Sequence, residues 1–269
     1  MTALAPSLPF HRPRLVGAEI LKLRKRRGLA VTTGLLTVGA SMLVSAILVL
    51  LHAENAAKHG PAGGVTNFGH TLWLLSMLGS VAGILVGATA GVGDLGAGVF
   101  KELVVTGRSR TALYAARIPG GLAVLFSFVA GGFAIAAVSS VVFAGSFAIP
   151  SVSLLVGGGF WLLLATSFWF AVSLGVASLI GSRTTPIAVL LPFNLAVSPL
   201  LAGLTMLGVG RDVFPVSALD QLIPHAIADV AGTVNGGPPM SHPAAALVLG
   251  LWALVSLGLG LWRTKTRDA

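Results

Sequence analysis

Few side chains in this sequence could carry out chemistry, and most of them lie outside its long apolar segments. His52, His59 and His70 fall in one polar link, and histidine is a common metal ligand. We expect these three to be solvated loop residues rather than a metal site. The chain has no cysteine, which excludes thiolate metal sites, disulfides and thiol chemistry. The sequence therefore predicts no metal and no cofactor in this chain.

No motif for nucleotide binding or hydrolysis occurs in the 269 residues. The phosphate loop Gly-x4-Gly-Lys-Ser/Thr is absent, and so are His-Glu-x2-His and Gly-x-Ser-x-Gly. The apolar segments also contain no Asp, Glu, Lys or Arg away from their ends, whereas ion-coupled carriers keep such residues within the membrane. We therefore expect neither an enzyme nor an ion-coupled carrier, and any transport must draw its energy from elsewhere.

Six apolar segments make up most of the chain. Hydrophobic residues account for 55% of the sequence and charged residues for 9%, against about 25% charged in soluble domains. A membrane-spanning helix needs about 20 mostly apolar residues. The predicted spans cover about 29–51, 71–92, 118–143, 152–180, 186–207 and 244–262. The sequence predicts an all-α polytopic membrane protein, with residues 1–28 and 263–269 as polar tails.

The basic residues are distributed unevenly between the two sets of links. Seven lie in residues 1–28, four in the 93–117 link and three after residue 262, and Arg183 lies on the same side. Only Lys58 and Arg211 lie on the other side. Since Lys and Arg collect on the cytoplasmic side, we expect both termini in the cytoplasm of a bacterium, with the chain in its plasma membrane. The net charge of +9 is thus explained without nucleic acid.

Two of the predicted spans carry residues with a structural signature. In the second span, glycines recur every four residues on one helix face, which allows another backbone to approach closely. They are Gly79, Gly83, Gly87 and Gly91. We favour packing within the bundle over a contact between protomers. In the fifth span, Pro192 and Pro199 flank Asn194 and predict a kinked helix that could serve as a gate, although such kinks are usually only structural.

A basic amphipathic segment precedes the first span. Residues 14–27 read RLVGAEILKLRKRR, with apolar residues early and cations at the end. Such a segment can lie along the inner membrane surface with its cations among anionic headgroups. A plain positive-inside anchor for the first span is the alternative, and the two are compatible. The residues assigned to this interfacial helix are Glu19, Lys22, Leu23 and Arg24.

The 93–117 link is much longer than the two to eight residues that a helix connection needs. Asp94 lies at the exit of the second span, and a short helix follows in which Phe100, Leu103 and Val104 share one side. Gly107 is placed to end that helix, as a glycine after a helix C-terminus does. The polar residues of the segment are Lys101, Glu102, Arg108 and Arg110. We expect a docking element for a soluble partner, with a solvated loop as the alternative.

At these residues the chain resembles the type-2 ATP-binding-cassette (ABC) permeases, the membrane subunits of many bacterial drug, antibiotic and polymer exporters. EILKLRKRR at 19–27 is similar to the start of the family's amphipathic N-terminal helix. The segment from Asp94 to Arg117 resembles its coupling segment, and residues 217–231 resemble its short outer helices. Val-Phe-Lys at 99–101 departs from the family's frequent Thr-Phe-Arg, so no detailed contact is carried over to Lys101.

The resemblance implies a dimer of identical or paralogous permeases, bound to two copies of a cytoplasmic ATPase that hold ATP and Mg²⁺. Phe100, Leu103 and Val104 would fill a groove on the ATPase, and the charged residues of the segment would set its orientation. The apolar spans suit a hydrophobic or amphipathic cargo. The alternatives are a non-transporting anchor, assembly factor or sensor subunit and, less favoured, an ion-coupled or passive carrier.

Overall fold

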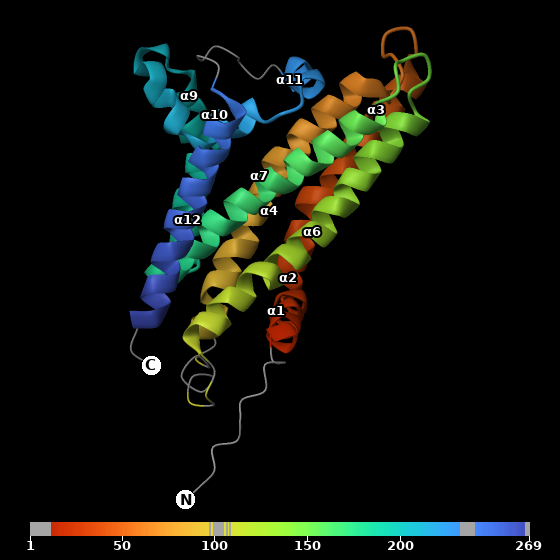
Figure 1. The fold of residues 1–269 in the computed structure, drawn as a ribbon. Coiled ribbons are helices and arrows are strands. Elements are labelled where there is room, and N and C mark those ends of the chain that lie inside the picture. The colour runs from red at the N-terminus through yellow and green to blue at the C-terminus, as the bar shows by residue number, and fades with distance from the viewer. Residues whose placement is uncertain are drawn as a thin grey trace, which may run out of the picture.

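The fold is a bundle of helices, seen in a computed structural model that describes residues 12–96, 98, 105, 107, 109–231 and 240–266 (Figure 1). The described residues contain helices and no strand. Six helices are long and apolar enough to cross a membrane. Helix α1 (Arg12–Lys25) and the end of α12 (His242–Thr266) lie at one end of the bundle, here called the basal end. Helices α9 (Ser198–Gly203), α10 (Pro215–Gln221) and α11 (His225–Ala231) lie at the opposite, distal end (Figure 1).

The six spans in the described residues are built from ten helical segments. Three of the spans are single segments in the middle of the chain, namely α4 (Gly64–Gly96), α6 (Arg110–Val142) and α7 (Val152–Ile180). The first span joins α2 (Arg27–Gly34), η2 (Leu35–Gly39) and α3 (Ala40–Glu54). The fifth joins α8 (Thr184–Pro192), η3 (Phe193–Val197) and α9 (Ser198–Gly203), and the sixth is α12 (His242–Thr266). Helix α1 (Arg12–Lys25) precedes the first span.

The helices begin earlier than the hydropathy pattern predicts. The second predicted span begins near residue 71, but α4 begins at Gly64, where the side-chain amide of Asn67 donates to the carbonyls of Pro61 and Gly63 at 3.0 and 3.1 Å. The third predicted span begins near 118, but α6 begins at Arg110 because the Ser109 hydroxyl accepts a hydrogen bond from the Ala112 amide at 3.2 Å. The Ser109 cap extends α6 beyond its apolar part, and the Asn67 bonds tie the first turn of α4 to the loop before it.

Helices α4 and α7 form the centre of the bundle. Buried residues make up 67% and 61% of their most apolar stretches, against 11% for the first span and 17% for the fifth and sixth. The glycine ladder of α4 faces α7 of the same chain. A β-carbon added at Gly83 would lie 2.7 Å from the Thr166 carbonyl oxygen, and one at Gly87 would overlap the Phe170 carbonyl oxygen. The ladder therefore allows the two backbones to touch.

The fifth span is interrupted between its two prolines. Helix α8 ends at Pro192, the wide π-helical turn η3 follows, and Pro199 lies in the first turn of α9. Asn194 and Ser198 are buried here, and the Asn194 Nδ2 and Ser198 Oγ atoms have no hydrogen-bond partner. The span has the predicted irregularity, and its use as a gate stays a prediction.

Three short helices connect the fifth and sixth spans at the distal end. They are η4 (Thr205–Val213), α10 (Pro215–Gln221) and α11 (His225–Ala231). The Trp161 indole of α7 donates to the Leu219 carbonyl at 3.0 Å, and Ala218 and Ile227 are fully buried. These contacts hold α10 and α11 over the distal end of the central helices. Burial raises the pKa of Asp220, in α10, from 3.8 to about 6.

Asp220 makes the stability of the protein depend on pH. Because its pKa is higher in the folded chain than in the unfolded chain, ionising it opposes folding. Below about pH 4 the Asp220 carboxyl is protonated in both the folded and the unfolded chain, so it does not change the free energy of unfolding. As pH rises from about 4 to 6, the free energy of unfolding falls. We expect Asp220→Asn to remove this component and to raise the melting temperature at pH 7. Thermal unfolding in detergent from pH 4 to 8 measures it, with Glu54→Gln as the control, and an unchanged pH profile in Asp220→Asn contradicts it.

Candidate functional site

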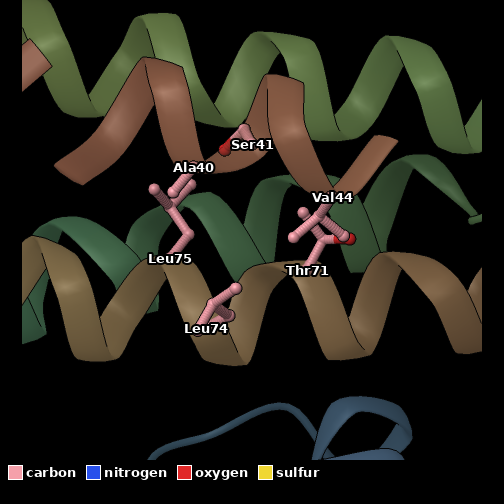
Figure 2. Close-up of a pocket in the computed structure, with 6 residues that line it drawn as sticks. All are labelled: Ala40, Ser41, Val44, Thr71, Leu74 and Leu75. Carbon is pink, nitrogen blue, oxygen red and sulfur yellow. The ribbon is translucent and has the colours of Figure 1, made fainter. Parts of the chain in front are cut away.

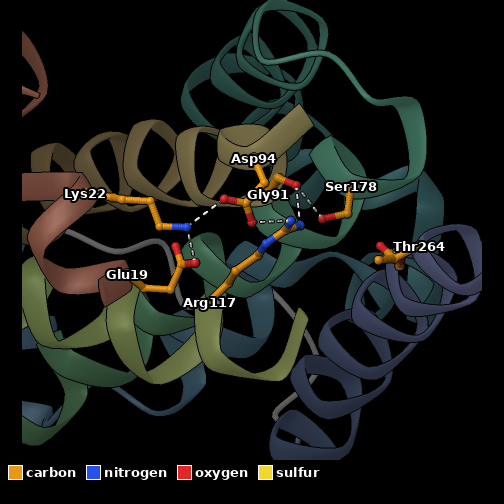
Figure 3. A network of polar contacts seen from close by, with 8 residues as sticks. Glu19, Lys22, Gly91, Asp94, Arg117, Ser178 and Thr264 are labelled. Carbon is orange, nitrogen blue, oxygen red and sulfur yellow. Dashed lines mark hydrogen bonds and ion pairs between the residues drawn. The ribbon is translucent and has the colours of Figure 1, made fainter. Parts of the chain in front are cut away.

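Four charged side chains from three helices meet at the basal end of the bundle (Figure 3). The Lys22 ammonium of α1 donates to the Glu19 carboxylate at 2.5 Å and to Asp94 Oδ1 at 2.6 Å. The Arg117 guanidinium of α6 donates to Asp94 Oδ2 at 3.0 Å. Asp94, near the end of α4, thus uses one carboxylate oxygen for each cation. We call these four residues the charge cluster.

Three members of the charge cluster are buried, and the side chain of the fourth, Lys22, is 42% exposed. Asp94 and Arg117 are 2% and 1% exposed, and Glu19 is 7% exposed. Two carboxylates face two cations, of which Arg117 is buried with them and Lys22 reaches them from the surface. A buried charge is costly unless a partner and further hydrogen bonds satisfy it. The cluster therefore holds its members together, because separating any one of them leaves a buried charge unpaired.

Arg117 also closes the end of α4. Its Nη1 donates to the Gly91 carbonyl at 2.8 Å, and the Ser178 hydroxyl of α7 donates to the same oxygen at 3.1 Å. Gly91 lies in the C-terminal part of α4, and a cation near this end suits the negative end of the helix dipole. Arg117 therefore fixes the position of α4 relative to α6, at the point where the chain leaves the bundle.

Helix α1 packs closely on α6 through the same residues. A β-carbon at Gly120 would lie 2.6 Å from the Glu19 β-carbon, and Leu23 is 3% exposed. Burial raises the pKa of Glu19, although its hydrogen bond from Lys22 acts in the opposite direction. Burial alone would lower the pKa of Lys22, but its bonds to Asp94 and Glu19 outweigh this effect and raise it. Lys22 therefore stays charged at neutral pH.

The sixth span is tied to the same region. Arg110 Nη1 donates to the Lys265 carbonyl at 2.9 Å, and the Tyr114 hydroxyl donates to the Leu257 carbonyl, also at 2.9 Å. These bonds join the first turns of α6 to the basal part of α12. The 94–110 segment therefore leaves and re-enters the bundle among residues that bind α1, α4, α6 and α12 together.

The structure brings together several of the residues singled out in the sequence and leaves others aside. Glu19, Lys22 and Asp94, assigned above to two separate segments, are bonded to one another. Leu23 is buried, whereas Arg24 is exposed. Gly107 lies in an exposed turn with φ of +82°, a backbone conformation that favours glycine. Outside the described residues lie Phe100, Lys101, Glu102, Leu103, Val104 and Arg108.

Arg117 is the member of the cluster that sequence reasoning did not single out. In the sequence, Arg117 was considered only as one of the four basic residues of the 93–117 link, just before the third predicted span. A signal was available, because an arginine inside a membrane helix is costly and is expected to have a partner. The Asp94 carboxylate, at the end of the neighbouring span, was the nearest candidate in the sequence.

Two hollows in the described residues lie away from the cluster. A hollow between α3 and α4 (Figure 2) leaves no space for even a water molecule. Its lining residues are Ala40, Ser41, Val44, Thr71, Leu74 and Leu75. The described residues also include no group of three His, Asp or Glu that could hold a metal ion. The cluster joins α1, α4 and α6 through ion pairs and hydrogen bonds.

Searches against known family models and against curated proteins find no match to this chain. Its function is therefore argued from its spans, its charges and the arrangement at the basal end.

Proposed function

We propose that this chain is the membrane-spanning permease subunit of an ATP-driven exporter and that a separate cytoplasmic ATPase supplies the energy. The observation that carries the proposal is the charge cluster, which clamps α1, α4 and α6 where the 94–110 segment leaves the bundle. The resemblance of that segment to an ABC coupling segment points the same way. Two ATPase copies would bind ATP and Mg²⁺, and a second permease protomer would complete the path.

The clamp gives the 94–110 segment a means to move the spans. A push on this segment is transmitted to Asp94 and from there to Lys22 and Arg117, because the buried Asp94 carboxylate resists separation from its cations. Helix α7 would follow α4, since the glycine ladder leaves no gap between them. The first and fifth spans are interrupted by π-helical turns and have few buried residues, so they can shift relative to this central unit.

The proposed orientation places the basal end in the cytoplasm of a bacterial cell. The 94–110 segment and the basic residues near both termini would then face the ATPase and the inner leaflet. A path between two protomers, lined by apolar spans, suits a hydrophobic or amphipathic cargo.

Co-purification with the ATPase encoded beside this chain tests the proposal. The tagged protein is extracted in mild detergent with that ATPase, and vanadate-sensitive ATP hydrolysis is assayed. We expect a stable complex, and we expect Phe100→Ala combined with Glu102→Arg to abolish association, because an apolar anchor is lost and a charge is reversed. Arg263→Gln, an exposed charge at the basal end of α12, is the control and should leave the complex intact.

Two results would contradict the proposal. If the double variant binds the ATPase as tightly as the wild type does, the docking role of the 94–110 segment is wrong. If no ATPase gene lies beside the gene for this chain and no ATPase co-purifies with it, the chain is instead a non-transporting anchor, assembly or sensor subunit.

A further inference from the structure

The two loops at the distal end of the first four spans interlock. The Gly63 amide donates to the Phe143 carbonyl at 2.7 Å, and the Val65 amide donates to the Ala148 carbonyl at 2.9 Å. A β-carbon at Gly60 would lie 2.6 Å from the Phe147 ring. In Figure 1 these loops form the pair of turns above α3, orange and green. The loop between α3 and α4 is therefore held in one shape despite its glycines and its proline.

A pocket of about 260 Å³ opens beside this interlocked pair. The Lys58 and Asn67 side chains supply polar groups, while Leu48, Leu51 and Phe147 supply an apolar wall. The pocket is also lined by His59, Gly60 and Pro61. Its volume equals that of roughly nine water molecules at about 30 Å³ each. It is smaller than the 300–1,000 Å³ typical of drug-sized ligands, so it fits a headgroup rather than a whole amphiphile.

The backbone that carries the cation of this pocket is held by hydrogen bonds, and the cation itself is exposed and not neutralised by a described carboxylate. The Lys58 amide donates to the Asn55 side chain at 3.0 Å, and the His52 ring nitrogen lies 2.8 Å from the His59 carbonyl, which fixes the loop on both sides of Lys58. Within the described residues, no carboxylate lies within ion-pair distance of the Lys58 ammonium. Lys58 is one of only two Lys or Arg residues in the distal links. A lone cation in a shaped pocket suits an anionic group.

We propose that this pocket binds the phosphate headgroup of a phospholipid in the leaflet at the distal end. Leu48 and Leu51 belong to the last turns of the first span, so the pocket opens where the apolar span meets the polar link. The lipid-facing side of α3 continues away from it, with Leu43, Ile47 and Leu50 from 45% to 68% exposed. A headgroup at Lys58 can therefore lay its acyl chains along α3. This inference does not depend on the ATPase.

A single fluorescent label can test the pocket, because the chain has no cysteine. A cysteine replaces exposed Ala57 beside the pocket, and an environment-sensitive dye is attached to the full-length protein in detergent micelles. Phosphatidylglycerol, diacylglycerol and inorganic phosphate are titrated separately. We expect a saturable response to phosphatidylglycerol and none to diacylglycerol. Lys58→Gln should weaken the response about tenfold, since a charge-assisted hydrogen bond is lost. The same label at exposed Val209 is the positional control.

Lys265→Gln, an exposed cation at the basal end, is the charge-matched control and should bind as the wild type does. An equal response to diacylglycerol, or an unchanged affinity in Lys58→Gln, overturns the phosphate site. A response that inorganic phosphate alone saturates overturns the assignment to a lipid. We expect Lys58→Gln to melt at the same temperature as the wild type, because Lys58 is an exposed loop residue. An unchanged melting temperature shows that any loss of binding is local.

Discussion

Arg117→Met is expected to lower the free energy of unfolding by about 3–5 kcal/mol, the usual cost of removing one partner of a buried ion pair. Methionine has a similar length but no charge, so Asp94 loses one of its two cations while it stays 2% exposed. The Gly91 carbonyl also loses a donor from α6. Unfolding in mixed micelles, followed by tryptophan fluorescence, measures the change.

Two further variants separate the charge from the shape of Arg117. Arg263→Met removes an exposed arginine at the same end of the bundle and should change stability by less than about 0.5 kcal/mol. Asp94→Leu combined with Arg117→Leu removes the whole pair, and apolar replacements of buried pairs are often neutral. We expect the double variant to be more stable than Arg117→Met. A double variant as unstable as the sum of its single variants would show that the two side chains do not act as a pair.

Gly87→Ala is expected to destabilise the protein by about 1–3 kcal/mol, as overpacking of a tight core does. The added methyl group would overlap the Phe170 carbonyl oxygen of α7, and backbone can yield only if the two helices move apart. If α4 and α7 move as one unit, as proposed above, the same substitution should also reduce ATP hydrolysis by the complex. Thermal unfolding and the ATPase assay measure the two effects.

Gly93→Ala is the matched control for this substitution. Gly93 lies on the same helix, and a β-carbon there meets nothing within 4 Å. Because alanine favours a helix by up to about 1 kcal/mol over glycine, Gly93→Ala should leave stability unchanged or raise it. Equal losses in the two variants would mean that a methyl group in this part of α4 impairs span insertion, and that the contact between α4 and α7 is not the cause.

The sequence alone determined the features that depend on local composition. An apolar run of about 20 residues can bury its backbone polar groups in a membrane only as a helix, so six such runs predict six spans, and the structure has six helices of that kind. The four-residue spacing put the glycines of α4 on one face, because that spacing is nearly one helical turn. The prolines at 192 and 199 similarly predicted the break in the fifth span.

Only the tertiary structure decided which of these features meet. Glu19 and Lys22 are more than 70 residues from Asp94, and nothing in local periodicity pairs them or adds Arg117. The sequence places the four glycines on one face of α4, but only the packing of the spans shows that this face contacts α7. The pocket at Lys58 likewise exists only because two loops interlock. Buried charges must find partners, and these partners can lie far apart in the sequence. Which residues meet depends on how the helices pack, and no short stretch of sequence contains that information.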